Sequence, residues 1–480
     1  MAGLLGGLPD AVLSVAYLVA ATLFILGLRE MTHPRTAMRG NLISAVAMFL
    51  AVGITVLWFE ILSPLVLFAA LLVGAAIGTW LATSVETTQM PQLVGLFNGF
   101  GGGASALVAG AELIELFGAG GATGVAAYDV TGAAAVAGVV GAVTFTGSLV
   151  AAGKLHGYVE APIRYPGEQA VKAGVLLVCV AGAAVLVGRP AGVGAALTAD
   201  WVPAYWGLLV AASVLGVLLV VPIGGADMPV VIALLNSLSG LAAATTGFVL
   251  DNSVLIIAGT LVGASGMILT TIMCRAMNRS LRNVLVGGLG DTRAGDVADI
   301  YEGNIMSTSP EEVAMLLETA RRVVIVPGYG MAVGQAQHAV GELAAMLGDA
   351  GVEVAFGIHP VAGRMPGHMN VLLAEADVPY EQMAELEAVN PTFADTDVVI
   401  VTGANDVVNP TALSDEPSPI QGMPVLRVWE ADVVVVNKRS LSHGYAGIPN
   451  PLFTYDNTYM LFGDARESMQ ALANEYKATR

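Results

Sequence analysis

The chain has 480 residues, of which 55% are hydrophobic and only 12% are charged, and its mean hydropathy is +0.73. Soluble domains carry about 25% charged residues, so this composition excludes a wholly soluble protein and predicts a membrane protein with a soluble part. The formal net charge is −18. Residues 286–480 hold 26 acidic and 10 basic residues, a net charge of −16. The soluble part is therefore strongly acidic, which excludes nucleic acid as a partner.

Residues 1–282 contain about nine apolar runs, each long enough to cross a bilayer as a helix. The first run follows Asp10 and precedes Arg29, which is the wrong polarity for a cleavable signal peptide. We therefore predict a polytopic α-helical membrane bundle over residues 1–282. Its spans are expected at residues 10–28, 40–58, 61–82, 91–111, 131–152, 171–188, 202–221, 229–250 and 253–274.

The basic residues between the spans predict the orientation of the bundle. They gather after the first, fifth and ninth spans, and only Arg189 falls on the other side. By the positive-inside rule, the N-terminus lies outside the plasma (inner) membrane and residues 275–480 are cytoplasmic. The residues that carry this prediction are Arg29, Arg35, Arg39, Lys154, Arg164, Lys172, Arg275, Arg279 and Arg282.

Few polar groups lie inside the predicted spans, and none of them is a histidine. Asn98 falls in the middle of the fourth span and Asn236 in the middle of the eighth, while Asp227 stands at the start of the eighth. A buried amide without a partner is costly in lipid, so we expect these groups to face each other, a neighbouring helix or water. They are either part of a proton path or structural, as interhelical hydrogen bonds for the two amides and as a helix cap for Asp227.

Residues 283–308 change to a Gly-rich and then Asp-rich composition, which predicts a linker. Ser309-Pro-Glu-Glu312 is typical of a helix start, with a Ser cap and a Glu three residues later. Residues 309–480 then alternate strand and helix patterns, which predicts a C-terminal α/β Rossmann-like domain with a parallel sheet. Its strands are expected at residues 322–327, 353–358, 397–402, 424–428 and 432–436.

A glycine turn follows the first of these strands. Residues 323–326 are apolar and β-branched, Gly328 and Gly330 come next, and a helical pattern runs from about residue 332 to 347. This arrangement presents backbone N–H groups to the pyrophosphate of a dinucleotide. The third glycine of the usual motif would fall at Val333, with Gly334 one position late, so an ordinary strand–turn–helix remains an alternative.

Two cations and a hydroxyl stand together after the last predicted strand, at Lys438, Arg439 and Ser440. An adjacent Lys and Arg suit a phosphate monoester, which in a dinucleotide site is the 2′-phosphate of NADP. The alternative is a solvated basic pair. Asp406 either orients the ligand or forms an Asx turn.

The sequence contains no pattern typical of a nucleophile–base pair or a metal cluster. Cys179 and Cys274 lie in apolar runs, so no disulfide framework is predicted. This fits hydride transfer, in which the protein positions a cofactor that carries the chemistry.

Several segments together resemble the β subunit family of proton-translocating NAD(P) transhydrogenases. The resemblance covers essentially the whole chain. In the soluble domain it rests on residues 328–333, 356–376, 403–406, 438–440 and 462–465, and in the membrane part on residues 224–230, 235–237 and 273–279.

The resemblance implies that the C-terminal domain binds NADP(H), with no side chain acting as an acid or base in hydride transfer. A separate α partner would bind NAD(H), hydride would pass directly between the two nicotinamides, and the working unit would be a two-fold assembly of αβ pairs. Proton passage through the bundle would drive NADP+ reduction, with Asn98, Asn236 and Asp227 on the proton path or in its coupling. The implied NADP(H) contacts are Gly328, Tyr329, Gly330, Val361, Ala362, Gly363, Arg364, Met365, Pro366, Gly403, Ala404, Asn405, Asp406, Val407, Gly422, Met423, Lys438, Arg439, Ser440, Leu441, Ser442, His443, Gly444, Tyr445, Asp464 and Ala465.

The chain departs from much of this family at Asn98, where a histidine central to proton transfer is expected. An amide does not titrate near neutral pH. Either a partner helix supplies the histidine, which is our hypothesis, or water and Asn236 serve without one. An NADP(H)-gated channel or transporter without redox chemistry is the alternative function, although the chain lacks a selectivity-filter sequence of the T-V-G-Y-G kind.

Overall fold

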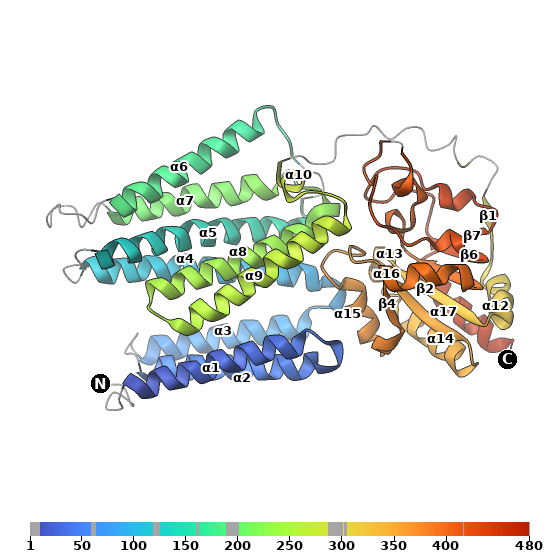
Figure 1. Ribbon diagram of the computed structural model, residues 1–480, viewed down its shortest axis with the longest axis horizontal. Coiled ribbons are helices and arrows are strands. Elements are labelled where there is room, and N and C mark those ends of the chain that lie inside the picture. Colours follow the sequence, from blue (N-terminus) through green and yellow to red (C-terminus); the bar gives the residue numbers. More distant parts are fainter. Residues whose placement is uncertain are drawn as a thin grey trace. The chain divides into compact units, whose positions relative to one another are not determined.

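The computed structural model describes residues 10–58, 64–118, 125–159, 163–188, 201–286, 301, 305–415 and 417–479. The chain divides into two compact units (Figure 1). The first holds residues 1–156, 163–221 and 234–268, and the second holds residues 157–162, 222–233 and 269–480. The predicted linker 283–308 falls largely on residues outside those described.

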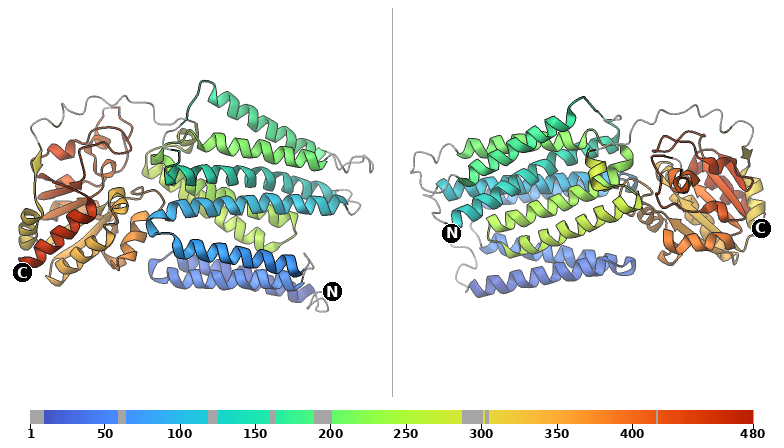
Figure 2. Two further views of the ribbon diagram at one scale, coloured as in Figure 1. Left: turned by 180° about the vertical axis from the view of Figure 1, so that it is seen from behind. Right: turned by 45° about the horizontal axis from the view of Figure 1, so that its top comes forward.

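Nine helices in the described part of the chain are long and apolar enough to cross a membrane, which confirms the predicted spans. Those of the first unit run side by side (Figure 2). The helices are α1 (Asp10–Met31), α2 (Pro34–Trp58), α3 (Pro64–Ser84), α4 (Met90–Gly118), α5 (Val125–His156), α6 (Glu168–Gly188), α7 (Trp201–Val220), α8 (Met228–Val249) and α9 (Ser253–Ala276), followed by the short α10 (Leu281–Val286).

Small residues bring α4 and α5 into backbone contact. A Cβ atom on Gly102 would lie 2.7 Å from the carbonyl oxygen of Gly141, and one on Gly141 would lie 2.4 Å from that of Gly102. Tyr205 of α7 donates a hydrogen bond of 2.7 Å to the backbone oxygen of Ala106 on α4. Close approach and interhelical hydrogen bonds replace the hydrophobic effect as the means of holding helices together in lipid.

The second unit contains a seven-stranded, all-parallel sheet in the order β1-β7-β6-β5-β2-β3-β4. This confirms the predicted parallel α/β domain. The strands are β1 (Met306–Ser307), β2 (Arg322–Pro327), β3 (Glu353–Ile358), β4 (Met383–Glu385), β5 (Val398–Thr402), β6 (Val433–Lys438) and β7 (Thr458–Phe462). The strand order reverses between β2 and β5, and such a reversal is where open α/β sheets bind ligands.

The predicted strand at residues 424–428 is wrong. The carbonyl of Val425 accepts from the side chain of Asn390 at 3.0 Å, and the N–H of Leu426 donates to Val407 O at 2.9 Å. The side chain of Asn390 also accepts from the N–H of Arg427 at 3.1 Å. These backbone groups are therefore satisfied without a strand partner. The strand β7 has no counterpart among the predicted strands.

Alternate residues of each strand enter two separate hydrophobic cores. Val323 and Ile325 of β2 pack into the core that includes α12 (Pro310–Thr319), α14 (Gln337–Asp349) and α17 (Ala465–Ala478). These three helices lie against one another on one face of the sheet (Figure 1). Val324 and Val326 point into the opposite core, which is built from loops and short helices. The run of β-branched residues is apolar on both faces because both faces are covered.

The helix start at Ser309 is confirmed as a capping box. The N–H of Glu312 donates to Ser309 Oγ at 3.3 Å, and Glu312 Oε2 accepts from the N–H of Ser309 at 3.2 Å. The predicted helix at residues 332–347 is instead two helices, α13 (Tyr329–Val333) and α14. They are separated at Gln335, whose φ of +50° is left-handed.

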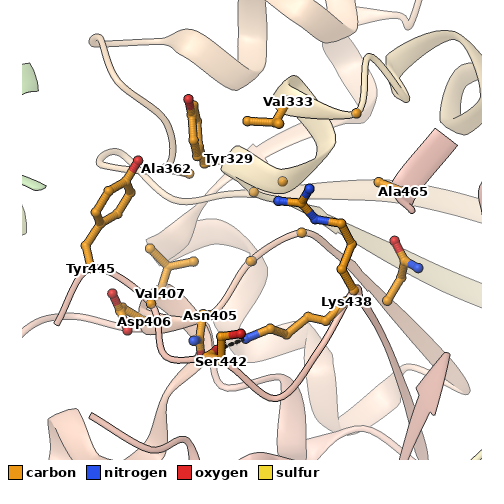
Figure 3. Close-up of a pocket in the computed structure, with 18 of the residues that line it drawn as sticks. Tyr329, Val333, Ala362, Asn405, Asp406, Val407, Lys438, Ser442, Tyr445 and Ala465 are labelled. Carbon is orange, nitrogen blue, oxygen red and sulfur yellow. Dashed lines mark hydrogen bonds between the residues drawn. The ribbon is translucent and has the colours of Figure 1, made fainter. Parts of the chain in front are cut away.

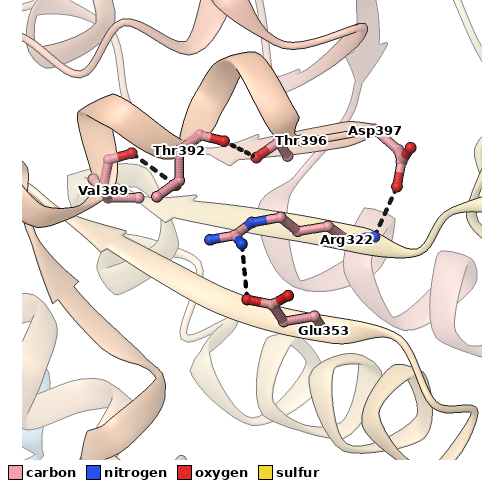
Figure 4. Close-up of polar contacts among 6 residues, drawn as sticks. All are labelled: Arg322, Glu353, Val389, Thr392, Thr396 and Asp397. Atoms are coloured by element: carbon pink, nitrogen blue, oxygen red, sulfur yellow. Dashed lines mark hydrogen bonds and ion pairs between the residues drawn. The ribbon is translucent and has the colours of Figure 1, made fainter.

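Polar groups hold the start of the central strands in place (Figure 4). Asp397 Oδ2 accepts from the backbone N–H groups of Arg321 and Arg322, each at 2.8 Å. These hydrogen bonds hold the pKa of the Asp397 carboxyl below its usual value. The side chain of Arg322 also pairs with Glu353 on β3 at 2.8 Å. These contacts fix the amino ends of the central strands, and the site lies at the opposite, carboxyl ends.

Candidate functional site

A cavity of about 380 Å³ lies at the carboxyl ends of the strands, around the point where the strand order reverses (Figure 3). Loops after β2, β3, β5, β6 and β7 contribute to its wall. The lining residues are Gly328, Tyr329, Gly330, Val333, Gly334, Val361, Ala362, Gly363, Gly403, Ala404, Asn405, Asp406, Val407, Asn437, Lys438, Arg439, Ser440, Ser442, His443, Gly444, Tyr445, Gly463, Asp464 and Ala465.

The loops after β2 and β5 meet backbone to backbone at the base of this site. A Cβ on Gly328 would lie 2.4 Å from Ala404 Cα, and one on Gly330 would lie 2.6 Å from Gly403 Cα. The N–H of Gly328 donates to Thr402 O at 2.9 Å, and that of Gly330 to Gly403 O at 2.8 Å. These two glycine N–H groups are therefore engaged within the protein, at the end of β5 and in the turn that follows it. The glycines are needed because two neighbouring strands end in touching turns.

Lys438 is the cation held inside the wall of the cavity. Its ammonium donates to the carbonyl of Ser442 at 2.8 Å and lies 4.9 Å from the ring centroid of Phe453 (Figure 3). A terminal atom of the Asn405 amide lies 3.0 Å away, and the amide orientation that places oxygen there gives the ammonium another acceptor. Burial lowers the pKa of Lys438 to about 8, although the Asp406 carboxylate opposes this. The neighbouring Arg439 is exposed at the surface.

Asp406 stands on the loop after β5 and has one satisfied and one unsatisfied oxygen. Its Oδ2 accepts from the N–H of Ala446 at 2.9 Å, whereas Oδ1 is buried without a hydrogen-bond partner. Burial raises the pKa of this carboxyl, while the Ala446 hydrogen bond and Lys438 act in the other direction. Both ring nitrogens of His443 are also buried without partners. These groups at the cavity wall require hydrogen-bond partners that the described residues do not supply.

An arginine–tyrosine cluster borders the same cavity. The guanidinium carbon of Arg364 lies 4.4 Å from the ring centroid of Tyr329, and Arg364 Nε donates to the hydroxyl of Tyr445 at 3.3 Å. The two tyrosine rings are 6.0 Å apart. Burial raises the pKa of Tyr329 to about 12, with Arg364 opposing it, so its phenol stays protonated. Arg364 does not itself line the cavity, but it contacts the two tyrosine side chains that do.

Two buried histidines brace the loop after β3, and neither was among the predicted site residues. His359 Nδ1 accepts from the N–H of Val361 at 3.2 Å, so its Nε2–H donates to Pro424 O at 2.7 Å. His368 Nδ1 accepts from the N–H of Arg364 at 3.0 Å. Burial is the main cause that lowers the pKa of each histidine to about 4, so both are neutral at physiological pH. They fix loop geometry as neutral hydrogen-bonding groups.

Six of the predicted contacts do not line the cavity. They are Arg364, Met365, Pro366, Gly422, Met423 and Leu441. Met423, which is 5% exposed, instead packs in a small cluster with Ala412, Ile420, Val425 and Ala446. Four lining residues were not predicted: Val333, Gly334, Asn437 and Gly463. Val333 and Gly463 lie inside the motifs at residues 328–333 and 462–465, and Gly334 and Asn437 are adjacent to a motif, so proximity along the chain is the signal that could have found them.

The predicted polar groups of the membrane helices have close partners. Asn236 on α8 donates from Nδ2 to Asn98 Oδ1 on α4 at 3.0 Å, so a hydrogen bond joins the two amides across the helices. Asp227 ends the short 3-10 helix η3 (Gly225–Asp227) and forms an ion pair of 2.5 Å with Arg279. The Asp227 side chain is 2% exposed. A buried carboxylate requires such a partner.

A family model described as NAD(P) transhydrogenase beta subunit matches residues 13–475. The chain belongs to this family. Two Rhodospirillum rubrum proteins named NAD(P) transhydrogenase subunit beta, one of them from a named strain, are each 47% identical to it over 464 residues. The matches cover 95% of this chain and 97% of each relative. Membership in the transhydrogenase family implies the use of nicotinamide nucleotides, and together with the nine apolar helices it indicates a membrane protein that works with an alpha subunit.

Proposed function

We propose that this chain is the NADP(H)-binding β subunit of a proton-translocating transhydrogenase. The observation that carries the proposal is the cavity at the strand reversal, where Lys438 is held beside the exposed Arg439 in a domain whose net charge is strongly negative. A local pair of cations is what an anionic ligand requires in such a field. The unpaired oxygen of Asp406 and the ring nitrogens of His443 fit a ligand rich in hydroxyl and phosphate groups.

The residues of the cavity have roles that follow from their contacts. Lys438 and Arg439 contact the 2′-phosphate and favour NADP over NAD. The rings of Tyr329 and Tyr445, with Arg364 between them, offer an apolar wall to a flat group, and Asp406 accepts from a hydroxyl or amide. The nicotinamide supplies the hydride chemistry when it is bound.

The finer functional proposals follow the family resemblance. An α partner carries NAD(H), hydride passes between the two nicotinamides, and proton movement through the helix bundle drives NADP+ reduction. The assembly is a two-fold arrangement of αβ pairs in the plasma membrane, with the N-terminus of this chain outside and its nucleotide domain in the cytoplasm. Residues 1–282 form the membrane bundle and residues 309–480 the nucleotide domain. Tyr301 and β1 of the predicted linker 283–308 belong with that domain, because β1 pairs with β7 and Tyr301 packs in the domain's core.

The binding claim is tested by titrating the αβ complex with NADPH and NADH. Wild type should prefer NADPH at the β site, and the double variant Lys438→Gln with Arg439→Gln should lose that preference. Hydrogen bonds to charged groups contribute about 1.5–3 kcal/mol, so a loss of at least tenfold in NADPH affinity is expected. The exposed Lys477→Gln, near the end of α17 and not among the lining residues, serves as a control for removing a cation elsewhere in the domain. Equal NADPH affinity in the double variant and wild type would contradict the assignment.

The redox claim is tested with the αβ complex in sealed vesicles. NADH-dependent reduction of an NADP+ analogue should change the internal pH. NADP(H) binding that alters an ion flux without hydride transfer would instead support the gated channel. Asn98 and Asn236 are amides, which do not titrate near neutral pH, so we propose that the α partner supplies the titrating group of the proton path. An α sequence without a membrane histidine would contradict that placement.

A further inference from the structure

Tyr301 lies within the predicted linker 283–308, yet the structure places it in the core of the nucleotide domain. It is 8% exposed and belongs to the hydrophobic core that contains Leu452 and Phe453. Its hydroxyl accepts a hydrogen bond of 2.7 Å from the backbone N–H of Asn450. Its ring stacks on that of Phe453 with the centroids 6.1 Å apart and an interplanar angle of 28°. An aromatic residue just ahead of the first strand is thus fixed by a polar and an apolar contact.

Both contacts of Tyr301 lead directly to groups that line the cavity. The ammonium of Lys438 lies over the ring of Phe453, 4.9 Å from the ring centroid, in a cation–π contact. The side chain of Asn450 donates to the backbone oxygen of Asn405 at 3.1 Å. Lys438 is the last residue of β6 and Asn405 lies in the loop after β5, and both line the cavity. Only one residue therefore separates Tyr301 from the cavity wall along either route.

We propose that Tyr301 is a positioning residue that raises nucleotide affinity by holding Phe453 and Asn450 against the cavity wall. The proposal rests on the NADP(H) site proposed above. When Tyr301 is docked, Phe453 and Asn450 hold Lys438 and Asn405 in place for the ligand. When the Tyr301 side chain is removed, the N–H of Asn450 loses its acceptor and the ring of Phe453 loses its stacking partner.

The hydrogen bond from Asn450 and the stacking on Phe453 depend on each other, because both residues belong to one short segment. The N–H of Asn450 is buried and needs an acceptor, so the segment after it rearranges when the phenol is removed. Such a rearrangement moves the ring beneath Lys438, because Phe453 belongs to the short 3-10 helix that Asn450 caps through its own side chain. Coupling is reciprocal, so a ligand that fixes Lys438 and Asn405 also favours the docked Tyr301.

The test uses the full αβ complex with Tyr301→Phe, which keeps the ring and removes the acceptor, and Tyr301→Leu, which removes both contacts. Tyr455→Phe is the matched control, because Tyr455 is half-buried and packs on the same core. The KM for NADP+ and the Kd for NADPH should rise about threefold to tenfold in Tyr301→Phe and further in Tyr301→Leu. The KM for NADH, which concerns the α partner, should stay at the wild-type value in both variants and in the control.

The outcomes separate this inference from the proposed function. NADPH affinity that stays within about twofold of wild type in both Tyr301 variants, even with a lower melting temperature, would show a purely structural role and overturn the inference. Equal increases in the KM values for NADP+ and NADH would also overturn it. Failure of wild type itself to bind NADPH would instead overturn the proposed function.

Discussion

Gly403 provides the sharpest test of why a glycine directly follows each of the two central strands, β2 and β5. Its φ is +67°, and a Cβ there would lie 2.4 Å from both the Cα of Gly330 and the backbone nitrogen of Met331. Gly447 has the same φ of +67°, but a Cβ there would meet nothing within 4 Å. Replacing each glycine by alanine therefore imposes the same left-handed strain, and only Gly403→Ala adds the backbone collision.

The expected magnitudes differ for that reason. A left-handed alanine costs about 1–2 kcal/mol, which is the whole cost for Gly447→Ala. The collision at Gly403 forces the loops after β2 and β5 apart, and overpacking of this kind adds about 1–3 kcal/mol. Each kcal/mol lowers the melting temperature of a domain of this size by about 2–4 °C. Gly403→Ala should therefore melt several degrees below Gly447→Ala.

Thermal unfolding of the purified complex, followed with and without NADPH, measures both effects. Gly403→Ala should also bind NADPH at least tenfold more weakly, since Gly403 lines the cavity and the loops that it separates form its base. Gly447→Ala should bind as wild type does. Equal melting temperatures and equal NADPH affinities in the two variants would refute the argument that backbone contact requires glycine here.

Three further predictions concern charged groups. Burial lowers the pKa of Lys438 to about 8, so its charge is lost and NADPH affinity should fall as pH rises through about 8. Lys438→Arg should flatten that profile in titrations from about pH 6.5 to 9.5 because arginine stays charged, and identical slopes would contradict this. The pKa of Asp397 is lower in the folded state than in the unfolded state. Its contribution to the free energy of unfolding is therefore fully present above the unfolded-state pKa of about 3.9, and it is lost as the pH falls through the folded-state pKa. The free energy of unfolding of Asp397→Ala at pH 7 should be about 2 kcal/mol lower than that of wild type, and it should depend less on pH in the acid range. The same pH dependence in variant and wild type would count against this role of Asp397. Asp227→Asn removes the carboxylate that pairs with Arg279 at 2.5 Å, so proton movement should uncouple from hydride transfer in vesicles, and an unchanged ratio of pH change to hydride transferred would exclude this role.

The sequence by itself determined the features that depend on local patterns. Runs of apolar residues set the nine membrane helices, because crossing a bilayer requires about 20 consecutive apolar residues. The strand patterns that became β2, β3, β5 and β6 depend only on neighbours along the chain, as does the capping box at Ser309. Twenty of the 26 contacts that the family resemblance implied line the cavity, whose wall is built from the loops that follow the parallel strands.

Tertiary structure decided what depends on contacts between distant residues. Residues 424–428 have a strand-like composition, but Asn390 and Val407 satisfy their backbone groups outside the sheet. Gly328 and Gly330 match a phosphate-binding pattern, yet their N–H groups bond to the neighbouring turn because β2 and β5 are adjacent. Tyr301 lies in a stretch with linker composition, and only the fold shows that Asn450 and Phe453 hold it next to the cavity. Local patterns fix which segments form helices and strands, whereas the packing of those segments fixes which polar groups remain for a ligand.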